Sequence, residues 1–68
     1  MDIITKRIVT NGKRKAKLAK LGACERREQI KRYIMAECVA LKVKLDAVTM
    51  RRMVACVSDR LHKMEAGV

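Results

Sequence analysis

Aromatic residues are almost absent from this chain. Tyr33 is the single aromatic among 68 residues, and Phe, Trp and Pro do not occur. The interior must therefore be filled by Ile, Val, Leu and Met, and a platform that stacks several bases on aromatic rings is excluded. A chain this short buries only roughly 60% of the surface that it exposes when unfolded, which predicts a thin core. Because a second copy would complete such a core, the sequence predicts a homodimer.

The chain also lacks the residue patterns of catalytic and metal sites. It has one histidine, His62, and neither a Gly-rich phosphate loop nor an H-E-x-x-H motif. Cys24, Cys38 and Cys56 lie fourteen and eighteen positions apart, whereas zinc sites usually take their ligands from closely spaced pairs. A helical chain of this size offers no deep cleft. We therefore predict that the protein is not an enzyme and holds no cofactor and no metal ion.

The cysteines and the apolar runs indicate a compartment. An odd number of thiols at these spacings does not form a disulfide framework, which indicates reducing surroundings. Cys38 and Cys56 stand among apolar residues and are expected to be buried, whereas Cys24 stands beside charged residues and is expected to be exposed. No run approaches the roughly 18 apolar residues of a membrane-spanning helix, and no signal peptide is expected. These features predict a cytoplasmic protein.

Positive charge dominates the chain and is concentrated in its first half. The formal net charge is +10; residues 1–32 hold eleven basic and three acidic residues, against six and four in residues 33–68. Such an excess attracts polyanions, namely nucleic acid, an acidic protein surface or an anionic membrane.

The first ten residues contain two adjacent apolar pairs, Ile3-Ile4 and Ile8-Val9, separated by polar residues. Because four of these residues are β-branched, residues 2–10 are predicted to form a short strand or a flexible arm. Asn11-Gly12 then indicates either a turn or the start of a helix near residue 13.

Residues 13–44 consist mainly of strong helix formers, with Gly22 as the one weak point. We predict a long helix over about 13–44, with a break at Gly22 as the alternative. A second helix is predicted over about 47–65, with Asp46 or Thr49 as its N-cap. Apolar residues at helical spacing give the two helices a core or dimer face. Its members are Ile30, Ile34, Cys38, Leu41, Met50, Val54, Val57, Leu61 and Met64.

The phase of these apolar residues predicts how the helices connect. If residues 30–64 formed one straight helix, the two stripes would lie about 160° apart around it. A reversal near residues 44–49 lets both stripes face one interior. The sequence therefore predicts a single all-α domain over residues 1–68: an arm over 1–12 and a helical hairpin over 13–66. Dimerisation would complete a four-helix arrangement.

Basic residues along the first helical segment predict a contact surface for nucleic acid or for an acidic partner. On a helix, lysine and arginine at a 3.6-residue spacing form a cationic ridge whose side chains can each meet a phosphate along a duplex. This spacing is followed by Lys13, Lys17, Lys20, Arg27 and Lys31, and the ridge also includes Arg14, Lys15, Arg26 and Arg32, which lie beside them. The alternative interpretation is a solvated face that keeps the chain in solution.

The charge pattern predicts a small basic regulatory protein that contacts nucleic acid, mainly its phosphate backbone, through an N-terminal cationic helix face. Asn11 and Gln29 are the only side-chain amides, so little equipment for reading bases is present. The alternative prediction is a homodimeric inhibitor, anti-activator or adaptor of the phage- or plasmid-encoded kind, which binds and blocks a host protein such as a transcription regulator. For that purpose the adaptable contacts would be Met35, Met50, Met53 and Met64, and arginine and tyrosine are the residue types enriched at interface hot spots. A helix lying on a membrane ranks last, since no Trp or Phe would anchor it.

Overall fold

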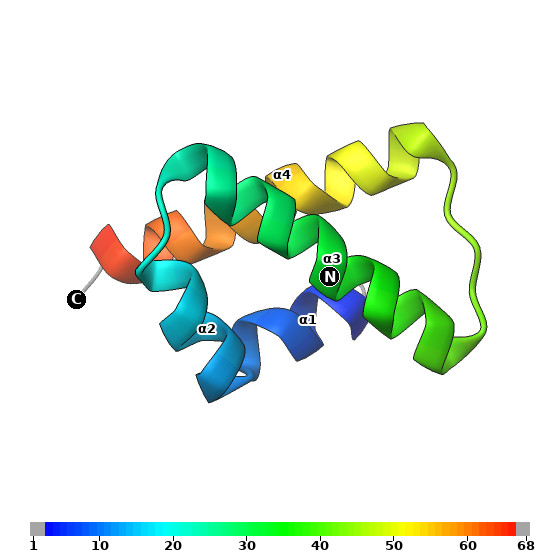
Figure 1. The fold of residues 1–68 in the computed structure, drawn as a ribbon, viewed down its shortest axis with the longest axis horizontal. Helices are drawn as coiled ribbons and strands as arrows, with labels where there is room; N and C mark the ends of the chain where they lie inside the picture. Colours follow the sequence, from blue (N-terminus) through cyan, green and yellow to red (C-terminus); the bar gives the residue numbers. More distant parts are fainter. Residues whose placement is uncertain (1–2, 67–68) are drawn as a thin grey trace.

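Four α-helices make up the computed structural model, which describes residues 3–66 (Figure 1). No strand occurs among these residues, and the prediction of an all-α protein is confirmed. The helices are α1 (Ile3–Thr10), α2 (Gly12–Ala19), α3 (Ala23–Leu41) and α4 (Ala47–Ala66).

The first helix, α1, corrects the prediction of a strand or flexible arm at residues 2–10. Residues 3–10 are helical, and residue 2 lies outside the described residues. Ile4, Ile8 and Val9 are buried in the core of the protein. Because positions four apart lie on the same side of a helix, Ile4 and Ile8 enter the core together. The burial of these side chains outweighs the modest helix penalty of β-branched residues.

A break near Gly22 divides the segment that the sequence predicted as one long helix. Asn11 caps α2 by accepting a hydrogen bond at 3.1 Å from the backbone N–H of Arg14. At the other end, the backbone N–H of Lys20 donates to the carbonyl of Lys17 at 3.2 Å, which tightens the last turn. Gly22 is the N-cap of α3 and has an extended backbone. The alternative of two helices meeting at Gly22 is therefore the correct one.

The third helix ends three residues before the predicted boundary, at a residue with left-handed backbone geometry. Lys42 has a φ angle of 56°. The backbone N–H of Val43 donates to the carbonyl of Cys38 at 2.9 Å, and that of Lys42 donates to Val39 at 3.3 Å. These two bonds form a Schellman motif, which satisfies carbonyls at the end of α3 and stops the helix.

The fourth helix begins where the sequence predicted. The side chain of Asp46 accepts a hydrogen bond at 2.7 Å from the backbone N–H of Thr49, so Asp46 is the N-cap and Thr49 is not. Hydrogen bonds from the side chain and backbone of Thr49 hold the pKa of the Asp46 carboxyl below its ordinary value. The cap therefore stays ionised beside the positive end of the α4 dipole.

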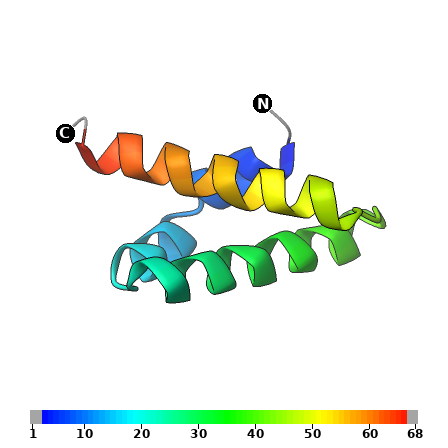
Figure 2. The same cartoon turned by 90° about the horizontal axis from the view of Figure 1, so that it is seen from above.

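The helices pack into one body with extents of 34 × 20 × 19 Å. Joined by residues 42–46, α3 and α4 lie side by side, and α1 packs across one face of this pair (Figure 2). The short α2 packs against α1 and α3, at the end of the molecule opposite the loop over residues 42–46 (Figure 1). None of the described helices has the length and apolar character needed to cross a membrane.

Most of the predicted core face is buried, but its two outermost members are not. Ile30, Ile34, Cys38, Val57 and Leu61 are buried, and Met50 and Val54 are partly buried against them. Leu41 and Met64 are 36% and 38% exposed in the single chain, because they lie near the C-terminal ends of α3 and α4. The sequence missed the buried residues Ile4, Ile8, Val9, Leu18 and Met53.

The apolar face assigned to dimerisation is largely covered within one chain. In the sequence prediction a second copy covered α3 and α4, whereas in the structure α1 and α2 pack against them. The homodimer stays a prediction, but the thin core no longer argues for it. Cys56 is exposed rather than buried, since the buried side of α4 passes through Met53 and Val57.

Candidate functional site

A buried carboxylate holds three helices together. Glu37 of α3 is 5% exposed, and its Oε1 accepts a hydrogen bond at 2.7 Å from Nη1 of Arg14 on α2. Its Oε2 lies 2.8 Å from Nε of Arg7 on α1, as an ion pair whose geometry does not make a hydrogen bond. The guanidinium of Arg14 also lies 4.9 Å from the ring centroid of Tyr33. We call Arg7, Arg14, Tyr33 and Glu37 the Glu37 clamp.

A second arginine of the predicted ridge is also engaged inside the protein. Nε of Arg26 donates to the carbonyl of Leu18 at 3.0 Å, and its Nη1 lies 3.2 Å from Oε1 of Glu65. The side chains of Arg14 and Arg26 are 23% and 17% exposed. Two of the nine predicted phosphate contacts are therefore occupied by internal partners, and neither is free to reach a ligand.

The other seven residues of the ridge are exposed. Within residues 3–66 none of them forms an ion pair. They do not follow one helix, because the break at Gly22 assigns them to separate helices. Lys13, Lys15, Lys17 and Lys20 belong to α2 and its C-terminal end, whereas Arg27, Lys31 and Arg32 belong to α3.

Three lysines occupy one side of α2. Lys13, Lys17 and Lys20 follow one another at steps of four and three, which places them on one side of a helix. Lys20 is the C-cap residue and keeps right-handed helical geometry, so it continues this spacing. Leu18, which is buried, anchors another side of the same helix. We call Lys13, Lys17 and Lys20 the lysine face.

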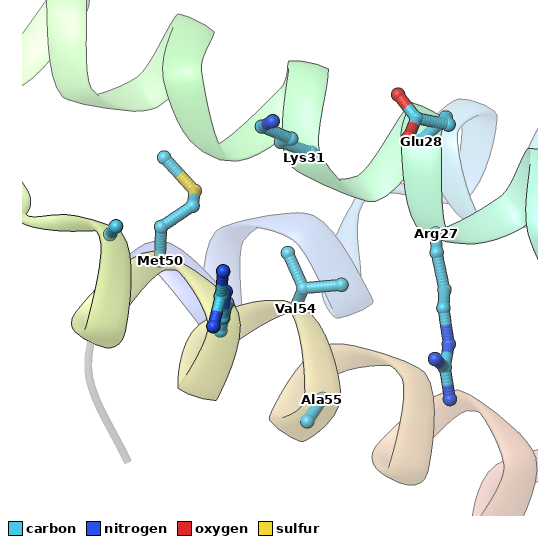
Figure 3. Close-up of a pocket in the computed structure, with 8 residues that line it drawn as sticks. Arg27, Glu28, Lys31, Met50, Val54 and Ala55 are labelled. Atoms are coloured by element: carbon cyan, nitrogen blue, oxygen red, sulfur yellow. The ribbon is translucent and has the colours of Figure 1, made fainter.

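Arg27 and Lys31 line a groove between α3 and α4. A hollow of about 520 Å³ has a mainly apolar floor, with Met50 and Val54 reaching from α4 toward α3 (Figure 3). A second hollow, of about 360 Å³, shares Arg27 and Ala55 with the first. We call the two together the α3–α4 groove. Its lining residues are Ala23, Arg26, Arg27, Glu28, Lys31, Ala47, Met50, Arg51, Val54, Ala55, Ser58, Asp59 and His62.

Arg51 is a groove residue that the sequence analysis did not select. It is exposed beside the partly buried Met50 and faces the hollow that Lys31 also lines. The neighbouring Arg52 does not line that hollow. Whether Arg51 or Arg52 faces the groove depends on how α4 is rotated about its own axis. The sequence pattern does not fix that rotation closely enough to choose between neighbouring residues.

The thiols and the histidine do not come together. Among residues 3–66 no three side chains of His, Cys, Asp or Glu are grouped as metal ligands would be. Cys24 and Cys56 are exposed and Cys38 is buried, each as a free thiol. Comparisons of the chain with families of related proteins, with curated proteins and with solved structures found no match.

Proposed function

We propose that this protein binds double-stranded nucleic acid through the phosphate backbone, with the lysine face as its main contact. One observation carries the proposal. Lys13, Lys17 and Lys20 are exposed on one side of α2, and within the described residues they have no acidic partner. The internal ion pairs use Glu37, Asp59 and Glu65 instead.

The spacing of these lysines suits a phosphate backbone. Lys13 and Lys20 lie seven positions apart, which is about 10 Å along a helix. Their long flexible stems let each ammonium group reach a separate phosphate. Since the lysine face holds no amide and no aromatic group, the expected binding is independent of base sequence and falls steeply with salt.

The test is binding to a random-sequence DNA duplex, measured by fluorescence anisotropy over a series of salt concentrations. Changing Lys13, Lys17 and Lys20 together to Glu should weaken binding at least tenfold. It should also reduce the slope of log affinity against log salt by about 2–3, because roughly 0.9 counterions are released per neutralised phosphate. No DNA binding by the unchanged protein at low salt would end the proposal.

A matched control separates the lysine face from net charge. Lys42, Lys44 and Arg52 are exposed, and changing them to Glu alters the net charge by the same amount. Lys42 and Lys44 belong to the segment that joins α3 to α4, and this segment lies at the end of the molecule away from α2 (Figure 1). If this control loses as much affinity as the lysine-face variant, the binding depends on total charge and not on the lysine face.

We further propose a non-enzymatic regulator of transcription that works in the cytoplasm. Three free thiols support a reducing compartment. The basic surface supports a role on DNA, where non-specific phosphate contacts position a protein on the duplex.

The second candidate is a homodimeric inhibitor or adaptor that acts on another protein. Here α3 and α4 would serve as a helical hairpin that presents a surface for association. Its support is a set of exposed apolar side chains near the loop end of the pair: Met35, Val39, Val43 and Val48, of which Val39 is 79% exposed. Met35 and Val39 are four residues apart on α3 and share one side of it. This surface differs from the face that the sequence assigned to a dimer.

A further inference from the structure

The α3–α4 groove combines an apolar floor with a basic rim. Met50 and Val54 are partly buried at its floor, where the small side chains of Ala47 and Ala55 leave room. Above this floor stand the basic side chains of Arg27, Lys31 and Arg51, with Glu28 as the one carboxylate of the larger hollow. An apolar surface under a cationic rim matches a ligand that is apolar on one side and anionic on its flanks.

Within residues 3–66 the groove is lined by α3 and α4 alone. The opposite face is covered by α1, which packs against both helices and buries Ile4 and Ile8. Figure 2 shows α3 and α4 side by side with α1 behind α4, and in Figure 3 the labelled residues of the larger hollow lie in front of the faint blue ribbon of α1. The helix α1 thus already packs against α3 and α4, and the groove could accept a second amphipathic helix on the other side of the pair.

The length of the groove fits several turns of a helix. Residues of α4 from Ala47 to His62 line it, which corresponds to about 22 Å or roughly four helical turns. A helix-in-groove contact uses apolar anchors at i, i+4 and i+7, which one side of a four-turn helix supplies.

The positive charge at the rim of the groove distinguishes among the ligands that could bind there. A second copy of this chain carries a net charge of +10 and would bring further cations to a basic rim. Nucleic acid would place its charged backbone over Met50 and Val54, and the groove has no aromatic ring on which a base could stack. An acidic amphipathic helix covers the floor with its apolar side and faces the rim with carboxylates.

We infer that the α3–α4 groove is a docking site for an acidic amphipathic helix of a partner protein. The apolar anchors of that helix lie over Met50 and Val54, and its flanking carboxylates meet Lys31 and Arg51. This second interaction surface is separate from the lysine face and does not depend on the nucleic-acid proposal.

The experiment uses a labelled synthetic peptide of about 15 residues. It carries Leu at i, i+4 and i+7 and Glu at the flanking positions, and its binding to the full chain is measured by anisotropy at about 0.15 M salt. The methyl NMR signals of Met50 and Val54 should shift on binding. Changing Lys31 and Arg51 together to Glu should weaken binding at least tenfold, and both residues are exposed, so the fold is retained. Ala55→Trp, which fills the groove without changing charge, should weaken it as well.

The controls exclude attraction by charge alone. The lysine-face variant replaces three cations elsewhere with carboxylates and should bind the peptide within about threefold of the unchanged protein, because exposed charges beyond about 8–10 Å are screened. A peptide with Lys in place of Glu should not bind. Equal loss in the lysine-face variant, or no binding of the acidic peptide, overturns the inference. The inference is also overturned if a DNA duplex shifts the Met50 and Val54 methyl signals and binds more weakly when Lys31 and Arg51 are changed. The groove would then be part of the nucleic-acid surface.

Discussion

Glu37 is the residue at which three helices meet. Its carboxylate is nearly inaccessible, yet Arg7 of α1 and Arg14 of α2 both approach it, at 2.8 and 2.7 Å. A buried carboxylate is costly unless cations and hydrogen bonds compensate for lost hydration. Arg14 also packs over Tyr33, so one side chain contributes both an ion pair and a cation–π contact.

Substitutions in the Glu37 clamp should lower the free energy of unfolding more when the changed side chain is more deeply buried. Glu37→Gln keeps the shape of the side chain but removes its charge, and we expect it to lower the free energy of unfolding by about 1–3 kcal/mol. Arg14→Ala should fall in the same range, whereas Arg7→Ala should cost less than about 1 kcal/mol because the Arg7 side chain is half exposed. Urea denaturation followed by circular dichroism measures all three.

Glu25→Gln on the exposed surface of α3 is the control for the loss of one carboxylate. If Glu37→Gln costs no more than this control, the clamp does not stabilise the fold.

At the scale of single residues, sequence reasoning identified which side chains are basic but not which are free. Arg14 and Arg26 lie beside the helical spacing of the ridge and were included in it. A helical spacing gives no information about partners 23 or 39 positions away in the chain. Their partners, Glu37 and Glu65, come close only through the packing of other helices.

At the scale of helices, α1 shows how a local preference is overruled. The β-branched residues of the first segment favoured a strand. Two adjacent apolar pairs are a poor strand pattern, however, because neighbouring residues of a strand point to opposite faces. The four-residue step from Ile4 to Ile8 was the available sign of a helix. An eight-residue helix is marginal in isolation, so contacts with α3 and α4 must stabilise it.

The end of α3 offers a stabilising substitution. Lys42 adopts left-handed geometry, which costs a residue with a Cβ roughly 1–2 kcal/mol relative to glycine. Replacing Lys42 with glycine would remove this cost, but part of the benefit is offset because glycine is more flexible in the unfolded chain. We expect Lys42→Gly to raise the free energy of unfolding by about 0.5–1 kcal/mol, measured by urea denaturation. Lys42→Ala removes the charge but keeps the Cβ and should bring no such gain. A gain of equal size in the alanine variant would mean that charge, not backbone geometry, limits this helix end.

The break between α3 and α4 lies close to the place that the apolar stripes indicated. On one straight helix the two stripes would be out of phase, and residues 42–46 separate the two helices. The stripes predicted the rotation of each helix less well. Met53 is buried although it lay outside the predicted stripe, while Met64 within it is exposed. A stripe fixes a face only to within about one residue, or 100°.

For the whole molecule, the proposed homodimer can be tested through the exposed apolar side of α3. If the proposal is correct, the chain sediments as a dimer at micromolar concentration, and changing Met35 and Val39 to Lys shifts it to a monomer without loss of helix content. Both side chains are more than half exposed, so the variant should fold. A monomer in the unchanged protein would contradict the proposal. Val57→Asp is unsuitable for this purpose, because Val57 is fully buried within one chain and its change would unfold the protein.

The Glu37 clamp has a consequence for any fragment of this protein. Because α1, α2 and α3 converge on one carboxylate, α2 owes its position to residues far along the chain. A peptide of residues 12–20 would carry all the lysines of the lysine face, but at nine residues it would be mostly unstructured in water. Such a peptide keeps the charges of the lysine face, but only the intact chain holds them at a fixed spacing.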